Sequence, residues 1–178
     1  MILMALNGER ADRGVRPVLP FSRVLCPTDL SERSREVVRV AAAVAARFAA
    51  SLVLVHVVQP LPAATPALGF PIGLAALETT RLSEAERRLR ELAIAGLPPG
   101  LSATVRAVLG SIVANEIVDL ARDESADLIV ISAYRPRGLR RLLFGSVVER
   151  VIRAAPCSVL TVRCSAKSPT QGTDQGAP

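Results

Sequence analysis

The sequence is poor in the residue types that usually carry metal or nucleophilic chemistry. It has one histidine, His56, and three cysteines, Cys26, Cys157 and Cys164, which show no CxxC spacing. Because a structural zinc site needs several Cys or His ligands held close together, the sequence excludes a Cys/His zinc set. A single histidine inside an apolar run also offers no Ser/His/Asp triad. We therefore expect no metal and no enzyme, and read the cysteines as reduced thiols of a cytoplasmic protein.

Long apolar runs and aromatic residues are also scarce. A membrane-spanning helix needs about 20 apolar residues, and Arg39 and Arg47 interrupt the best candidate, residues 37–50. Residues 1–6 are apolar, but no basic segment precedes them, which disfavours a secretory signal. Tryptophan is absent and aromatic residues make up 3% of the chain, so few side chains are available to stack on nucleic acid bases. We expect neither a membrane protein nor a nucleic-acid binder.

What the sequence does contain is aliphatic residues and arginine. Half of the 178 residues are hydrophobic, and the formal net charge is +6. This length suits one domain, and the apolar content is too high for a disordered chain. Residues 135–153 hold six arginines and one acid, Glu149, which is 6 − 1 = +5. The positive charge is therefore concentrated in one segment and not spread over a basic surface.

Short apolar runs alternate with helical patterns along the chain. Five runs are nearly uniformly apolar and predict strands: residues 24–26, 52–58, 103–109, 128–131 and 159–162. Apolar residues at helical spacing predict helices between them, the first capped by Ser31 and running to about Phe48. Uniformly apolar strands are typical of a parallel sheet that helices cover on both faces. The order predicts a doubly wound α/β fold, with a loop at residues 59–73.

The composition divides the chain into three parts. Residues 1–20 have mixed charges and no sustained period, which predicts a flexible N-terminal arm. Residues 165–178 are small and polar, which predicts a disordered tail. The domain is then residues 21–164.

Ligands of such sheets bind beyond the carboxyl ends of the strands, so the residues that follow each strand are the candidates. Asp29 follows the first strand, either as an ordinary turn acid or as an acceptor for an adenine amino group or a ribose hydroxyl. An arginine-rich loop follows the fourth strand and leads to a helix that begins with Gly145 and Ser146. A helix N-terminus suits phosphate, although a plain capped helix fits the same residues. The P-loop motif GxxxxGK[ST] is absent, which excludes a P-loop ATPase.

Four segments carry a resemblance to a known family: VLCPTDLS at residues 24–31, LVHVV at 54–58, ADLIVI at 126–131 and LRRLLFGSVVERVIRAAPCSVLTV at 139–162. Residues 21–164 resemble the universal stress protein family. The resemblance implies a doubly wound five-stranded parallel sheet of order 3-2-1-4-5 flanked by four helices, and a role in stress response. It also implies a homodimer formed through the last strand, at Val159, Leu160, Thr161 and Val162, and unknown protein partners.

Nucleotide-binding members of that family carry the motif G-x2-G-x9-G-[ST]. In this sequence Ser132 and Arg135 stand at the first two glycines, while Gly145 and Ser146 are kept. The resemblance assigns Asp29 and Val57 to adenosine contacts. The full candidate nucleotide set is Pro27, Thr28, Asp29, Val57, Ser132, Arg135, Gly145, Ser146 and Val147.

The two lost glycines leave two functions open. A side chain at Arg135 obstructs the path of a phosphate, and Pro136 removes a backbone donor, which favours a stress-response regulator whose degenerate site binds ATP weakly or not at all. Alternatively, Arg135 swings out and pairs with the phosphates of an ATP-binding switch. A binder of other anions or nucleic acid ranks last. No cofactor is certain, and ATP is possible.

Overall fold

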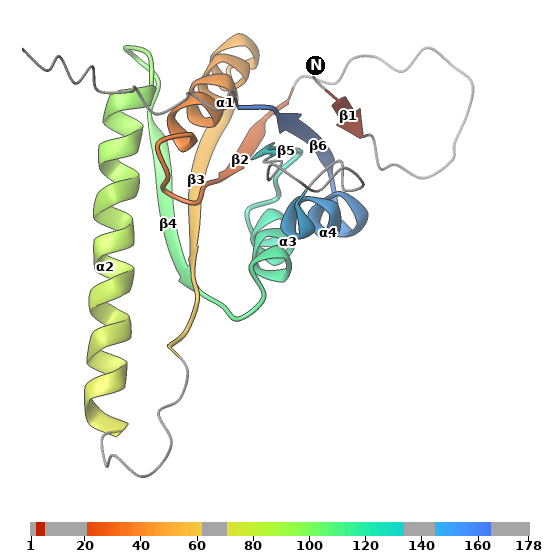
Figure 1. Ribbon diagram of the computed structural model, residues 1–178. Coiled ribbons are helices and arrows are strands. Elements are labelled where there is room, and N and C mark those ends of the chain that lie inside the picture. The colour runs from red at the N-terminus through yellow and green to blue at the C-terminus, as the bar shows by residue number, and fades with distance from the viewer. Residues whose placement is uncertain (1–2, 6–20, 62–70, 134–144, 165–178) are drawn as a thin grey trace, which may run out of the picture.

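Five parallel strands form the centre of the molecule (Figure 1). The computed structural model describes residues 3–5, 21–61, 71–133 and 145–164. The parallel strands are β2 (Arg23–Pro27), β3 (Ser51–Val58), β4 (Ala103–Leu109), β5 (Leu128–Ser132) and β6 (Ser158–Val162). They lie side by side as β6-β5-β2-β3-β4. Counted along the chain this is the order 3-2-1-4-5, which confirms the predicted topology.

Two helices cover each face of the sheet. The four described helices are α1 (Ser34–Phe48), α2 (Pro71–Gly96), α3 (Val113–Asp123) and α4 (Ser146–Ala154). Leu52 and Leu54 of β3 pack in one core with α1 and α2, and Val53 and Val55 pack in a second core with α3 and α4. Successive strand residues point to opposite faces, so both faces are apolar only because the strands are uniformly apolar.

The first helix begins later than the sequence predicts. Helix α1 starts at Ser34, its N-cap residue is Arg33, and no side chain caps it. Ser31 instead belongs to the preceding turn, where its carbonyl accepts a hydrogen bond from Ser34 N at 2.9 Å. The expected Ser31 cap is therefore wrong.

Helix α2 begins inside the segment that was expected to be a loop. Residues 59–73 contain four prolines, but the last of these, Pro71, is the first residue of a 26-residue helix. Proline fits the first turn because the N–H that it lacks has no partner there. Figure 1 shows α2 standing beside β4 for much of its length. None of the helices in the described ranges is long and apolar enough to cross a membrane.

A sixth strand, β1 (Leu3–Ala5), was not expected. It pairs antiparallel with β6, in the register Leu3 to Thr161 and Ala5 to Val159. Three residues of the segment predicted to be an arm thus extend the sheet. Strand β1 lies on the outer edge of β6, which is the edge that the expected dimer would use.

Candidate functional site

A cavity of about 570 Å³ opens at the carboxyl ends of β2, β3 and β5. This volume lies in the range of small-molecule sites. Its walls are mostly aliphatic, from Val55, Val57, Val113, Ile117 and Ile131. The helices that follow β2 and β5 along the chain, α1 and α4, lie on opposite faces of the sheet, and the cavity lies at this switch, which is the usual ligand position of this fold.

Most of the candidate residues line this one cavity. They are Pro27, Thr28, Asp29, Val57, Ser132, Gly145, Ser146 and Val147. Arg135 lies outside the described residues. The sheet order places the residues after β2 between those after β5 and those after β3. The structure thus brings together segments distant in sequence, and the contact of each residue with a nucleotide stays a prediction.

The turn after β2 orients Asp29. Its Oδ1 atom accepts hydrogen bonds from Ser31 N at 3.0 Å and from the Ser34 hydroxyl at 2.7 Å. Leu30 between them adopts a left-handed conformation, with φ of 58°, which closes the turn. Both hydrogen bonds converge on one carboxylate oxygen and fix the orientation of the side chain, which lines the cavity.

Asp29 is ionised at neutral pH. Burial raises the pKa of its carboxyl, whereas hydrogen bonds from Ser31 and Ser34 and the charge of Arg33 lower it. The lowering prevails, and the pKa lies below its ordinary value of 3.8. A carboxylate that accepts several hydrogen bonds favours the charged form. The cavity therefore holds a fixed negative charge beside its aliphatic wall.

His56 connects β3 to the turn that carries Asp29. Its Nδ1 atom lies 2.8 Å from the carbonyl oxygen of Thr28, and Thr28 N donates to Val55 O at the same distance. A carbonyl only accepts, so Nδ1 carries the proton and His56 donates. The imidazole thus links β3 to the turn that carries Asp29, which is a structural role.

The N-terminus of α4 also borders the cavity, through Gly145, Ser146 and Val147. Gly145 is the N-cap residue and makes no side-chain cap, and its carbonyl accepts from Glu149 N at 3.0 Å. The first N–H groups of the helix are therefore not satisfied by a capping side chain, and the helix dipole adds partial positive charge. This arrangement can receive an anionic group.

Ser132 ends β5 beside this helix start. It is half-buried, and its Oγ lies 3.5 Å from the Sγ of Cys164. Burial is the main cause that raises the pKa of the Cys164 thiol, and burial with the nearby Cys164 raises the pKa of Cys26 to about 12. Neither thiol is a ready nucleophile, because the thiolate is the reactive form. In the described part of the chain no group of His, Cys, Asp and Glu side chains is arranged to hold a metal.

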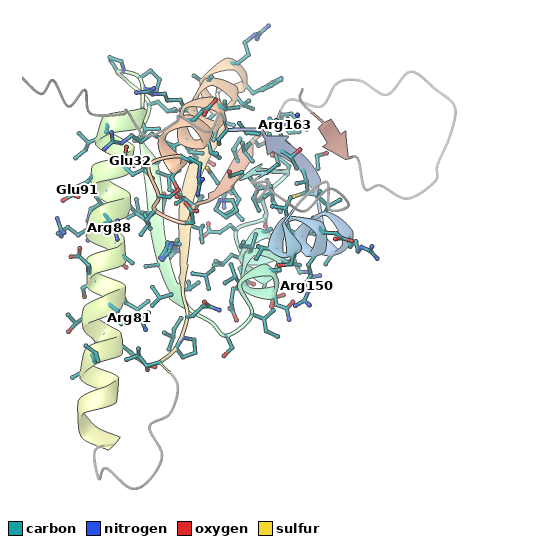
Figure 2. All side chains as sticks on the ribbon, viewed as in Figure 1. Glu32, Arg81, Arg88, Glu91, Arg150 and Arg163 are labelled. Carbon is teal, nitrogen blue, oxygen red and sulfur yellow. The ribbon has the colours of Figure 1, made fainter. Side chains whose placement is uncertain are left out.

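The prediction from sequence missed one wall of the cavity. Gln59 and Arg81 line it, and Arg81 Nη1 donates to the Gln59 carbonyl at 2.8 Å. Figure 2 shows Arg81 extending from α2 toward the strands. Gln59 lay in the expected loop, and Arg81 lies in the segment between the second and third strands, where a helix was expected. No local signal distinguished this arginine from the others of α2.

Comparison with known proteins identifies the family. The model of the universal stress protein family matches residues 20–163. A universal stress protein of Methanocaldococcus jannaschii is 34% identical over 144 residues, which cover 80% of this chain and 82% of the relative.

Solved structures agree with that match. The structure of universal stress protein UspA from Lactobacillus plantarum has a TM-score of 0.64 at 25% identity and covers 81% of this chain and 97% of its own. A universal stress protein in complex with cAMP has a TM-score of 0.54 at 26% identity, over 82% and 99%. The chain belongs to the universal stress protein family.

Proposed function

We propose that this chain is a cytoplasmic stress-response regulator that acts as a dimer, with a degenerate nucleotide site that binds ATP weakly or not at all. The proposal assigns a binding role and no catalytic residue. The related structure in complex with cAMP supports a nucleotide as the class of ligand. In the proposed orientation the phosphate lies at Gly145 and Ser146, and the base extends along the wall formed by Val57.

The observation that carries the proposal is the side chain at Ser132. It stands where nucleotide-binding relatives have the first glycine of their motif, and it lines the same cavity as Gly145 and Ser146 at the start of α4. A glycine leaves bare backbone against which a ribose or phosphate can lie. The serine side chain takes part of that space, and Arg135 replaces the second glycine of the motif.

The test is a thermal unfolding titration with Mg-ATP. A ligand at a concentration equal to its Kd adds only ~0.4 kcal/mol of stability, against ~2.7 kcal/mol at a hundredfold excess. We expect no more than the smaller shift at millimolar ATP. The double substitution Ser132→Gly with Arg135→Gly restores the motif and should tighten binding at least about tenfold, or ~1.4 kcal/mol. Micromolar ATP binding by the unsubstituted chain would overturn the proposal.

One observation favours the alternative, an ATP-dependent switch. Asp29 is ionised, is oriented by hydrogen bonds at Oδ1 and lines the cavity, so its carboxylate can accept a hydrogen bond from a ligand. For this alternative we expect micromolar Mg-ATP binding, and its loss in Asp29→Ala. Protection of the chain from limited proteolysis by ATP would show the conformational response that a switch requires.

The dimer remains a proposal that rests on the family resemblance. Strand β1 pairs with the outer edge of β6, so a dimer through backbone pairing at that edge has to displace it. Sedimentation of the full chain beside a chain that lacks residues 1–5 tests this. We expect the shortened chain to dimerise more tightly, because an unpaired strand edge pairs readily with another chain. Two monomeric samples would count against the dimer.

A further inference from the structure

Arg81 occupies a distinct place in the cavity. Its anchor, Gln59, directly follows β3 after Val58, whereas Gly145 follows β5 in sequence and starts α4. Strand β2 lies between β3 and β5 in the sheet. Arg81, beside Gln59 after β3, and Ser132, at the end of β5, therefore border opposite ends of the cavity, with Asp29 after β2 between them.

Few charged side chains line the cavity, so Arg81 has a large influence on which ligand can bind there. Among the described residues that line it, Asp29 and Arg81 are the two that carry a formal charge at neutral pH. The Arg81 side chain is half-buried, and one of its N–H groups is taken by the Gln59 carbonyl. The guanidinium has further donors and no acceptor. It therefore presents hydrogen-bond donors alone to whatever occupies its end of the cavity.

This donor-only character selects among nucleobases. The argument rests on the proposed function, in which a phosphate lies at the α4 N-terminus and the base reaches toward β3 and hence toward Arg81. Guanine has two adjacent acceptors, O6 and N7, that a guanidinium contacts bidentately. Adenine has N7 beside an amino group, which places a donor against donors. The geometry points to Arg81 as a specificity-determining residue that makes this cavity favour a 6-oxopurine nucleotide over an adenine nucleotide.

This inference adds a second reason for weak ATP binding. Ser132 acts at the phosphate end, whereas Arg81 acts at the base end, and the two effects are independent because they lie at opposite ends of the cavity. Restoring the phosphate end therefore improves binding of every purine nucleotide and leaves the preference between bases unchanged.

The test is calorimetric titration of the full chain with GMP, IMP and AMP. A bidentate contact discriminates bases by about fivefold or more. We expect GMP and IMP to bind at least about fivefold more tightly than AMP, because both have O6. In Arg81→Gln, which keeps a polar side chain and removes the guanidinium, this ratio should fall to near one.

Arg88→Gln is the matched control. Arg88 is two turns further along α2, is exposed, and its Nη2 also donates to a backbone carbonyl, that of Leu30 at 3.4 Å, but it does not line this cavity. We expect it to keep the parent affinities and the parent ratio. Equal thermal unfolding of the three proteins verifies that the variants fold.

Several outcomes overturn the inference. Equal or tighter binding of AMP removes it, as does an equal loss of all three nucleotides in Arg81→Gln. Tight GMP with weak IMP assigns the preference to the 2-amino group and not to Arg81. If no nucleotide binds, the inference is overturned, whereas the proposed function, which allows that ATP does not bind, is retained. Micromolar ATP binding together with the fivefold preference would instead overturn the proposed function and leave Arg81 as the selecting residue.

Discussion

Both ends of the sheet carry an aspartate and an arginine, but these side chains are used differently. At the amino end they hydrogen-bond to the protein itself, and at the carboxyl end they line the cavity. At the amino end, where β2 and β5 begin, Asp127 accepts from Ser22 N at 2.6 Å and from Arg23 N at 3.1 Å, so both its oxygens are occupied. At the carboxyl end, Asp29 lines the cavity, and its Oδ1 accepts from Ser31 N and from the Ser34 hydroxyl.

The arginines differ in the same way. At the amino end, Arg23 Nη1 donates to the Glu124 carbonyl at 2.7 Å, and Arg106 Nε donates to the Glu124 carboxylate at 3.1 Å. At the carboxyl end Arg81 contacts one backbone carbonyl and otherwise faces the cavity. Side chains that satisfy one another stabilise the fold, and those that keep free donors and acceptors can bind a ligand.

The strongest way to break this contrast is Asp127→Ala at the amino end. It removes the acceptor of two backbone N–H groups, and we expect a loss of about 1.5 kcal/mol in the free energy of unfolding. Chemical denaturation measures it. Asp127→Asn keeps one carbonyl oxygen and should cost less, and nucleotide affinity should be unchanged in both. An Asp127→Ala chain as stable as the parent would show that Asp127 does not hold this end of the sheet.

A smaller effect is expected from Asp29→Asn at the carboxyl end, and it should depend on pH. The folded pKa of Asp29 lies below its ordinary value of 3.8. Its contribution to stability is therefore complete above pH 3.8 and is lost as the pH falls through the folded pKa. Denaturation of both proteins across this range should give curves that differ near neutral pH and converge in acid. A difference that is constant with pH would exclude the charge of Asp29 as the cause.

The smallest effect is expected from Arg106→Ala. Its ion pair with Glu124 is largely exposed on the arginine side, where the side-chain exposure is 56%. Surface pairs of this kind contribute about 0.5 kcal/mol, and less at high salt. A double-mutant cycle with Arg23→Ala measures whether the two arginines couple through Glu124. A coupling energy near zero would show that the two arginines contact Glu124 independently. Asp127 would then be the main polar residue that stabilises this end of the sheet.

The fold was largely predictable from local patterns. Largely apolar segments predicted the five parallel strands, because helices cover both faces of the sheet and bury most residues of β2, β3, β5 and β6. The starts of α1 and α2 were not predictable, since the Asp29 turn binds Ser31 and Ser34 before α1 and since Pro71 is compatible both with a loop and with a first helical turn. Strand β1 is three residues long, and only its partner β6 makes it a strand.

The site was predictable in part. Asp29, Ser132 and Gly145 were found because they directly follow strands or begin a helix, positions that topology brings to one edge. Arg81 was not found, because α2 contains several arginines and the sequence does not say which of them faces the strands. Exposed arginines such as Arg87 pair with Glu84 on the same helix. The orientation of α2 on the sheet directs Arg81, unlike Arg87, toward Gln59 and the cavity.

The sequence by itself determined the order of strands and helices and indicated the cavity residues Ser132, Gly145 and Ser146. Both depend on neighbours along the chain, through apolar periodicity and through the motif around Gly145. Only the tertiary structure decided that Arg81 lines the cavity and what covers the edge of β6. Those features depend on contacts between segments far apart in the chain, Gln59 with Arg81 and β1 with β6. Such contacts form through packing and backbone pairing that no single segment encodes.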